Sequence, residues 1–240
     1  PFGTYLAAFA QHILPVENKE TEDDRLMYLQ PLPKSKKMIG GAAISVKQIN
    51  DETMHMLELA YENVNQAFGQ LFSDKTDEQI YKREDTVNYL DKVISEYIST
   101  ALATPNLNVN ISQALSSYYL MLVDIERISD YAVNMNHQAT KRLQGDMTIS
   151  EIEIVEHMKK LCVDMKNDLD DVEEAERKDD VIDSLVSSWR EAQIQALKQK
   201  KCSSEVSMML SRIFTDFERI NDHALNVSQE LDKITVEIPD

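Results

Sequence analysis

Apolar side chains recur at helical spacing along most of this chain. In the first long stretch they are separated by three or four residues: Met54, Leu57, Tyr61, Val64 and Phe68. This spacing places them on one face of a helix. The pattern continues along the chain and predicts six long helices, at about 38–72, 76–103, 110–144, 150–175, 177–201 and 203–233. We therefore expect an all-α fold.

Glycine and proline are scarce, which supports the same conclusion. The 240 residues include 5 Gly and 6 Pro, whereas average usage of roughly 12% would give about 29. Turns draw on both residues, so an all-β or α/β fold is disfavoured. Between residues 34 and 238 the only proline is Pro105, which is expected to end the second helix. Gly145 is expected to end the third, and Thr76 and Gln79 have the spacing of a capping box.

The third and sixth predicted helices repeat one polar pattern. Residues 124–135 read DIERISDYAVNM and residues 216–227 read DFERINDHALNV, with seven of twelve positions identical. A match in the order of polar residues indicates an internal repeat. A weaker match joins EDTVNYL at 84–90 to DDVIDSL at 179–185. The chain is therefore predicted to form two tandem three-helix bundles after a short N-terminal segment, with divisions at 1–33, 34–145 and 146–240.

Carboxylates recur four residues apart in both copies of the repeat. Glu126 precedes Asp130, and Glu218 precedes Asp222, so each pair shares one helix face. Like charges at this spacing destabilise an isolated helix by a few tenths of a kcal/mol. A bound cation would compensate, because carboxylate and amide oxygens suit hard or borderline metals.

A neighbouring helix can complete each of these sites with a second pair of oxygen donors. The predicted metal ligands are Glu84, Asn88, Glu126 and Asp130 in the first unit and Asp179, Asp183, Glu218 and Asp222 in the second. An amide four residues further along each repeat helix extends the set, namely Asn134 and Asn226. The alternative is that Arg127 and Arg219 pair with these acids in a surface network.

Catalytic patterns are weak. A di-iron carboxylate bundle would use two Glu-x-x-His motifs and two further glutamates, and the sequence has one such motif, Glu52–His55. There is no G-x-S-x-G and no P-loop. We therefore expect a protein without enzymatic activity.

Charge and cysteine content restrict the partners and the cell compartment that we expect for this protein. The chain has 25 basic and 42 acidic residues, a net charge of −17, which argues against nucleic acid as a partner and against broad adsorption to anionic lipid. The two cysteines, Cys162 and Cys202, form no disulfide framework, which indicates a reducing compartment. No stretch is long and apolar enough to span a membrane alone.

The repeated DIERISDYAVNM and DFERINDHALNV helices, in a doubled three-helix arrangement, resemble the PhoU family over about residues 34–235. PhoU-like proteins carry E(D)-x-x-x-D signatures on paired helices, and these bind metal clusters, iron or zinc among them. The resemblance implies that six residues take this role: Glu126, Asp130, Glu218, Asp222, Asp179 and Asp183. Asn88 stands where the family pattern has Asp, which implies a weaker or empty first site.

The N-terminal residues indicate a subtype. The chain starts at Pro1 with an apolar stretch, 1–14, followed by a charged stretch, 17–25. This order resembles the C-terminal region of bacterial Na⁺/phosphate cotransporters of the NptA-like type. The resemblance implies a metal-associated regulatory domain at the cytoplasmic face of the bacterial membrane, which modulates phosphate transport. Its partners would be the membrane domain of the same chain and a second copy of itself.

Two other functions remain open. The first is a free-standing PhoU-type regulator that restrains a phosphate ABC transporter and its sensor kinase. The second is a di-metal helical-bundle enzyme.

Overall fold

The structure is a computed structural model that describes residues 25–29, 41–72, 78–139 and 147–235. Six helices account for most of these residues, and the described ranges contain no strand. The predicted all-α class is therefore confirmed. The helices are α2 (Gly41–Gln70), α3 (Gln79–Leu102), α4 (Val109–Ala139), α5 (Ile149–Asn167), α6 (Val172–Lys198) and α7 (Ser204–Asp232).

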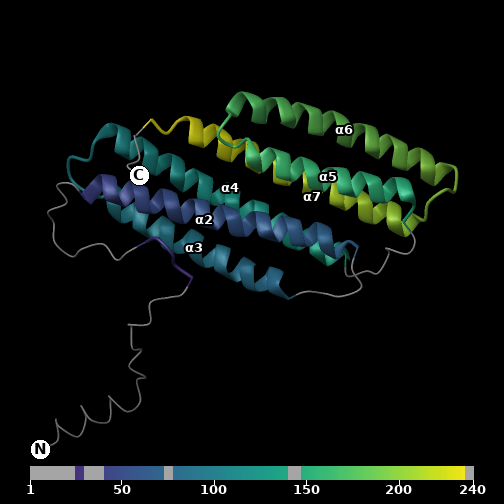
Figure 1. The fold of residues 1–240 in the computed structure, drawn as a ribbon, viewed down its shortest axis with the longest axis horizontal. Helices are drawn as coiled ribbons and strands as arrows, with labels where there is room; N and C mark the ends of the chain where they lie inside the picture. The colour runs from purple at the N-terminus through teal and green to yellow at the C-terminus, as the bar shows by residue number, and fades with distance from the viewer. Residues whose placement is uncertain (1–24, 30–40, 73–77, 140–146, 236–240) are drawn as a thin grey trace, which may run out of the picture.

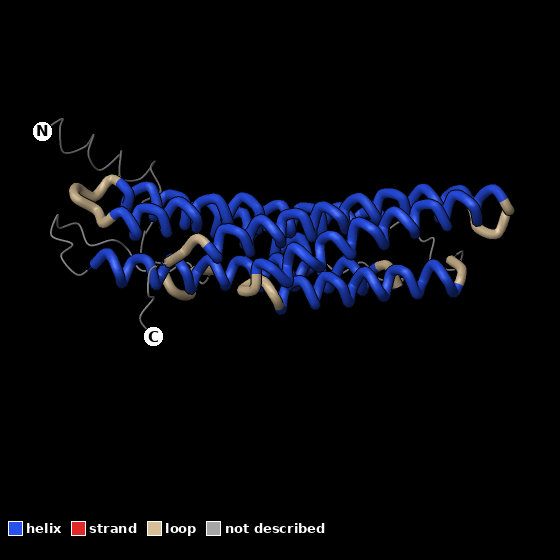
Figure 2. Tube along the Cα trace, turned by 90° about the horizontal axis from the view of Figure 1, so that it is seen from above, coloured by secondary structure: helices blue, strands red, loops and turns tan. Residues whose placement is uncertain are grey.

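The helices form two three-helix units that share a long contact. Helices α2, α3 and α4 pack together, and α7 packs against both α5 and α6 (Figure 1). The two repeat helices, α4 and α7, contact each other along the middle of the molecule. The body is elongated, with the helices running along its length (Figure 2). None of the described helices combines the length and the apolar character needed to cross a membrane.

The apolar faces predicted from the sequence form the core. On α2, Leu57, Val64 and Phe68 are buried as expected. On α7, Phe214 and Phe217 are buried and pack against Trp189 of α6. Fully burying one such side chain contributes about 1.5–3 kcal/mol, so packing of these faces drives helix association.

The predicted boundary between the fourth and fifth helices is wrong. The sequence predicted one helix to 175 and the next from 177, whereas α5 ends at Asn167 and α6 begins at Val172. Asp171 determines the start of α6, because its Oδ1 accepts a hydrogen bond from the backbone N–H of Glu174 at 3.1 Å. Such an N-cap satisfies a free donor in the first helical turn.

The predicted capping box at Thr76 and Gln79 stays a prediction, because Thr76 lies outside the described residues. The structure begins α3 after Glu78, which makes no side-chain capping bond. A capping box that was not predicted occurs at the start of α5, where Thr148 and Glu151 bond each other's backbone N–H groups. The residues around Gly145, the divisions at 33/34 and 145/146 and the segment 1–24 lie outside the described ranges, so these boundaries stay predictions.

A short segment before the bundle is anchored to α2 by a buried carboxylate. Glu52 is fully buried, and its oxygens accept hydrogen bonds from the backbone N–H groups of Met27, Tyr28 and Leu29 at 3.1, 2.7 and 2.9 Å. His55 Nδ1 lies 2.9 Å from Glu52 Oε1. The only Glu-x-x-His motif of the sequence therefore serves to hold residues 27–29.

The ionisation of Glu52 follows from the same contacts. Burial raises the pKa of Glu52, but the hydrogen bonds from His55 and from the three backbone N–H groups together lower it below its ordinary value. Nearby, the Arg25 guanidinium lies 3.6 Å from the centre of the Tyr89 ring of α3. Residues 25–29 are thus attached to both α2 and α3.

Candidate functional site

The predicted donors of the first unit face one another between α3 and α4. Asn88 Nδ2 donates to Glu84 Oε1 at 3.2 Å, and Ser129 Oγ donates to the other oxygen of Glu84. Burial raises the pKa of Glu84 to about 7; the Ser129 bond opposes this rise, and the charges of Asp130 and Glu126 add to it. The four predicted residues of this unit therefore lie close enough to influence one another.

One further carboxylate belongs to this group and was missed from the sequence. Burial raises the pKa of Asp91, and the charge of Asp91 in turn raises the pKa of Glu126. Asp91 lies seven residues after Glu84 on α3, so its spacing was the available signal. We call Glu84, Asp91, Glu126 and Asp130 the first carboxylate cluster. Asp91 supplies the fourth carboxylate where Asn88 lacks one.

We call the predicted donors of the second unit, Asp179, Asp183, Glu218 and Asp222, the second carboxylate cluster. The structure brings Asp179, Asp183 and Asp222 together, whereas Glu218 lies one turn before Asp222 on α7 and pairs with Arg190. Burial raises the pKa of Asp179 to about 6, and the charges of Asp183 and Asp222 raise it further. Burial also raises the pKa of Asp222, which Arg219 opposes. Oδ1 of Asp179 is buried without a hydrogen-bond partner. A buried acceptor in this state costs about 1–3 kcal/mol, so a cation would fit here.

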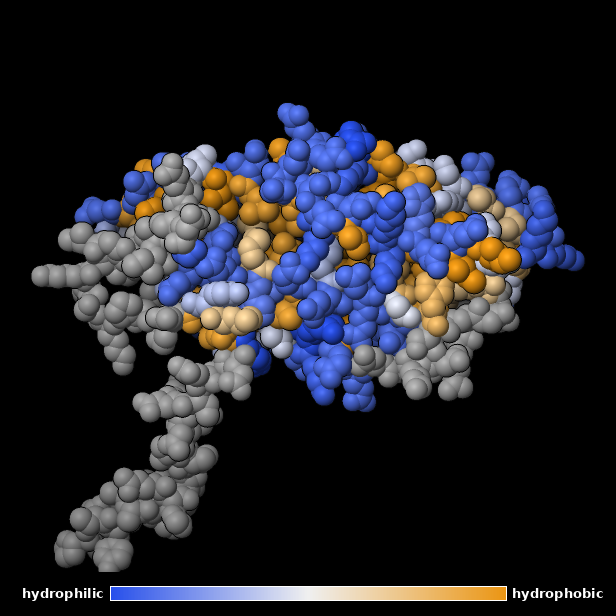
Figure 3. Space-filling view, viewed as in Figure 1, coloured by the Kyte–Doolittle hydropathy of each residue, from blue (hydrophilic) through white to orange (hydrophobic). Residues whose placement is uncertain are grey.

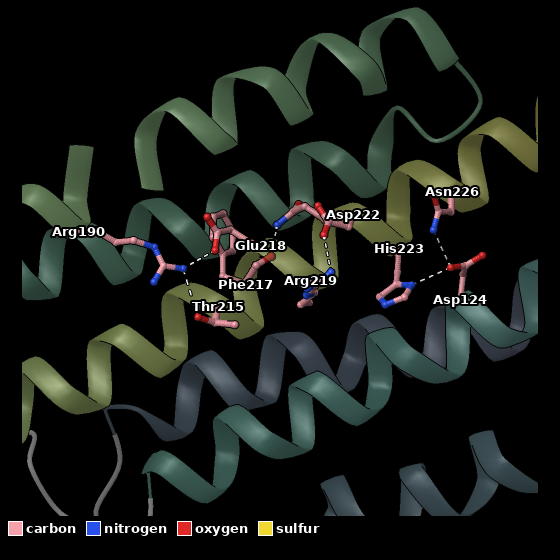
Figure 4. Close-up of polar contacts among 10 residues, drawn as sticks. Asp124, Arg190, Thr215, Phe217, Glu218, Arg219, Asp222, His223 and Asn226 are labelled. Carbon is pink, nitrogen blue, oxygen red and sulfur yellow. Dashed lines mark hydrogen bonds and ion pairs between the residues drawn. The ribbon is translucent and has the colours of Figure 1, made fainter. Parts of the chain in front are cut away.

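Arginines neutralise part of both clusters. Arg127 lies 3.5 Å from Glu126 and 3.1 Å from Asp130, and Arg219 lies 3.5 Å from Asp222. Arg190 of α6 pairs with Glu218 and also donates to Thr215 (Figure 4). This is the surface network that the sequence left open as an alternative, with Arg190 as a member that was not predicted.

The clusters are not arranged as closed metal sites. Among the described residues, no group of three or more His, Cys, Asp or Glu side chains has a geometry that could hold a metal ion. The side chains of Arg127 and Arg219 are 50% and 56% exposed, and exposed ion pairs contribute about 0–1 kcal/mol. Rotating these guanidinium groups away from the carboxylates into solvent therefore costs little free energy.

The two amides that extended the predicted stripes lie elsewhere. Asn226 donates to Asp124 of α4 at 2.9 Å, and His223 Nδ1 lies 2.7 Å from the same Asp124 oxygen (Figure 4). The His223 ring stacks on Tyr131. The bond between Asn226 and Asp124 thus connects the two units, and Asp124 is not a member of the second cluster. Asp124 and His223 were not predicted as a contact, although both lie within the repeated motif.

The repeat counterpart of this contact is an open cavity of about 310 Å³. Asp216 corresponds to Asp124, and Asn134 corresponds to Asn226. The cavity is lined by Asn134, Gln138, Ser211, Arg212, Thr215 and Asp216. Burial raises the pKa of Asp216 to about 6, and Arg212 opposes this rise. Asn134 therefore faces this cavity.

Comparisons with known proteins agree with this architecture. The family model described as "PhoU domain" matches residues 53–139 and 149–231, which correspond to the two three-helix units. A curated relative, the phosphate-specific transport system accessory protein PhoU homolog 1 of Thermotoga maritima, is 23% identical over 197 residues. The match covers 76% of this chain and 84% of that protein.

Two solved structures share the fold. The phosphate transport system regulatory protein PhoU of Streptococcus pneumoniae aligns with a TM-score of 0.72 at 20% identity, covering 83% of this chain and 99% of that one. PhoU of Pseudomonas aeruginosa aligns with a TM-score of 0.69 at 20% identity, covering 79% and 96%. With both units matched by the family model, this chain belongs to the PhoU family.

Proposed function

We propose that this chain is a PhoU-type regulator of phosphate transport that acts through contacts with a transport system. The observation that carries the proposal is the match of the PhoU family model to both three-helix units. The names of its relatives, an accessory protein and a regulatory protein of phosphate transport, support the same role. The regulator would work at the cytoplasmic side of the membrane.

Two arrangements of this regulator differ in how it reaches the transporter. The comparisons favour a free-standing regulator. The alignments cover 96% and 99% of the length of two solved chains, which are named PhoU and phosphate transport system regulatory protein PhoU. The other arrangement is a regulatory domain joined to a Na⁺/phosphate cotransporter. It rests on the apolar stretch 1–14 and the charged stretch 17–25, and the anchoring of residues 25–29 on α2 would then fix the bundle relative to the preceding chain.

Complementation tests both the function and the arrangement. The chain is expressed in a bacterium that lacks its own PhoU, and phosphate uptake and a phosphate-starvation reporter are measured. If the chain alone restores repression of phosphate uptake and of the reporter, the free-standing regulator is supported. If repression of both requires fusion to a Na⁺/phosphate membrane domain, the joined arrangement is supported. A folded chain that changes neither readout in either form contradicts the proposal.

We also propose that the two carboxylate clusters bind divalent or transition metal ions, iron or zinc by family resemblance. The buried Oδ1 of Asp179 without a partner supports this assignment, as do the raised pKa values of Glu84 and Asp179. Asp and Glu oxygens from α3 and α4, or from α6 and α7, would hold the ion. The ion would supply positive charge that joins the two helices of each pair.

The metal assignment is tested by elemental analysis of protein purified without chelator. The double variant Asp130→Asn/Asp222→Asn keeps side-chain size and removes one carboxylate from each cluster, so bound metal should fall. The control variant Asp85→Asn/Glu153→Gln removes two exposed carboxylates outside the clusters and should keep its metal. Equal metal content in the two variants would rule out the clusters as the binding sites.

A further inference from the structure

The turn between α6 and α7 is basic in an acidic chain. Residues 192–204 contain three lysines, Lys198, Lys200 and Lys201, and no acidic residue. This segment therefore has a charge of +3, and the rest of the chain has a charge of −20, which together give the net charge of −17. All three lysines are exposed, and among the described residues none of their ammonium groups has a hydrogen-bond or ion-pair partner.

Exposed apolar side chains lie at the same end of the molecule. Ile149, Ile194 and Leu197 are 78%, 52% and 40% exposed. Gln193 of α6 donates to Glu151 of α5 at 2.7 Å, so the start of α5 and the end of α6 meet here. Hydrophobic and hydrophilic surface lie side by side at this end, on the right in Figure 3. We call Ile149, Ile194, Leu197 and the three lysines the basic tip.

The matching turn of the first unit differs in charge. It connects α3 and α4 at the opposite end of the molecule (Figure 1), and residues 99–109 contain no charged side chain. Both turns place one residue in the left-handed region, Asn106 at φ 59° and Lys200 at φ 57°. Asn adopts this region more readily than Lys. The geometry of the turn therefore does not explain the lysine in the second unit.

We propose that the basic tip docks on an anionic lipid surface. Unpaired lysines next to such a surface each raise the partition about fivefold, and apolar side chains beside them can enter the interfacial region. Two exposed acids, Glu191 and Glu205, flank the lysines. The acidic residues in the first half of α6 do not prevent the contact, because this helix has 27 residues and is about 40 Å long, so they lie beyond the Debye length of about 8 Å at physiological salt.

This inference goes beyond phosphate regulation and is tested without it. The purified chain is sedimented with vesicles of phosphatidylcholine alone or with added phosphatidylglycerol. We expect binding that depends on phosphatidylglycerol and weakens with salt. The variant Lys198→Gln/Lys200→Gln/Lys201→Gln should lose about a hundredfold in partition, since each lysine accounts for about fivefold.

A matched variant and a local probe separate the tip from overall charge. Lys82→Gln/Lys92→Gln/Lys160→Gln makes the same change in net charge at exposed lysines elsewhere and should bind like wild type. A polarity-sensitive dye on Cys202, the less buried of the two cysteines, should report an apolar environment on vesicles. The same dye on Thr104→Cys in a Cys202→Ser background should not respond.

Four results would overturn the proposal. The first three are no dependence on phosphatidylglycerol in the wild type, equal loss in both lysine variants, and a dye response at residue 104 but none at 202. The fourth is a basic tip that does not bind vesicles but binds an acidic protein segment, because the surface would then belong to a protein partner. Circular dichroism of each variant confirms that the helices are retained.

Discussion

Replacing Glu52 with glutamine should release residues 27–29 from the bundle. The Glu52 carboxylate is fully buried and accepts hydrogen bonds from three consecutive backbone N–H groups. Glutamine has nearly the same size, so the packing around it is retained. It has no charge and only one acceptor oxygen, so the bonds to the segment weaken.

The expected effect follows from the number of bonds. A hydrogen bond to a charged group contributes about 1.5–3 kcal/mol, and one between neutral groups about 0.5–1.5 kcal/mol. The loss is therefore about 1 kcal/mol for each of the three N–H groups, or about 3 kcal/mol in total. The freed N–H groups can bind water, so this energy is lost from docking of the segment and the six helices stay folded.

Hydrogen exchange measures the release directly. A loss of about 3 kcal/mol lowers protection of the Met27, Tyr28 and Leu29 amides by about two orders of magnitude, with little change in α4 or α7. Glu96→Gln is the control, because Glu96 is exposed on α3. Equal protection of the three amides in both variants would refute the reasoning.

The docking should also depend on acid. The pKa of Glu52 in the folded chain is lowered from 4.5, so its stabilisation is fully present above pH 4.5 and is lost as the pH falls through the lowered value. Amide protection of residues 27–29 in the wild type should therefore fall in this acidic range. Glu52→Gln should lack the acid-dependent step.

Three further predictions concern the helix junction, the unit interface and the first cluster. Asp171→Ala removes the N-cap of α6 and should lower the free energy of unfolding by about 1 kcal/mol, whereas Asp170→Ala, at an exposed neighbour, should not; urea titration compares them. Asp124→Ala leaves His223 and Asn226 without their acceptor and should lower the free energy of unfolding by about 1–3 kcal/mol. The repeat counterpart Asp216→Ala, at an open cavity, should lower it less. A larger loss for Asp216→Ala than for Asp124→Ala would contradict the interface assignment. Asn88→Asp adds a fifth carboxylate beside Glu84, so it should destabilise the metal-free protein and increase metal bound per chain; unchanged metal content would separate Asn88 from the site.

Helices could be predicted from the sequence because their apolar faces must pack. On α2, four of the five predicted apolar positions, Leu57, Tyr61, Val64 and Phe68, are buried, and Met54 is half-buried. The α5–α6 boundary failed for a local reason: Asp171 lies within an acidic stretch, with no Gly or Pro beside it to mark the end of a helix. Its capping bond is visible only once the backbone is in place.

The candidate site divides in the same way. Residues on one helix, such as Glu126 and Asp130, follow from spacing, and the internal repeat indicated which neighbouring helix would face them. Contacts between helices far apart in sequence do not follow. The pairing of Arg190 with Glu218 depends on the packing of α6 on α7, and the bond of Asn226 to Asp124 depends on the packing of α4 on α7. The backbone donors to Glu52 have no side-chain signature at all.

The carboxylate clusters make the free energy of folding less favourable, and this cost is an argument for a bound cation. The pKa of Glu84 rises to about 7 and that of Asp179 to about 6, above the values of the unfolded chain. Such groups take up protons on folding, so their effect on stability becomes less favourable as the pH rises from about 4 through 6 or 7. Exposed arginines recover little of this cost, and α7 leaves Asp179 Oδ1 without any donor. A purely structural contact would be better served by apolar residues, such as Val186, which replaces Asp91 in the second unit and is buried. The presence of four carboxylates in each unit at this cost therefore supports the proposal that a positively charged ligand binds there.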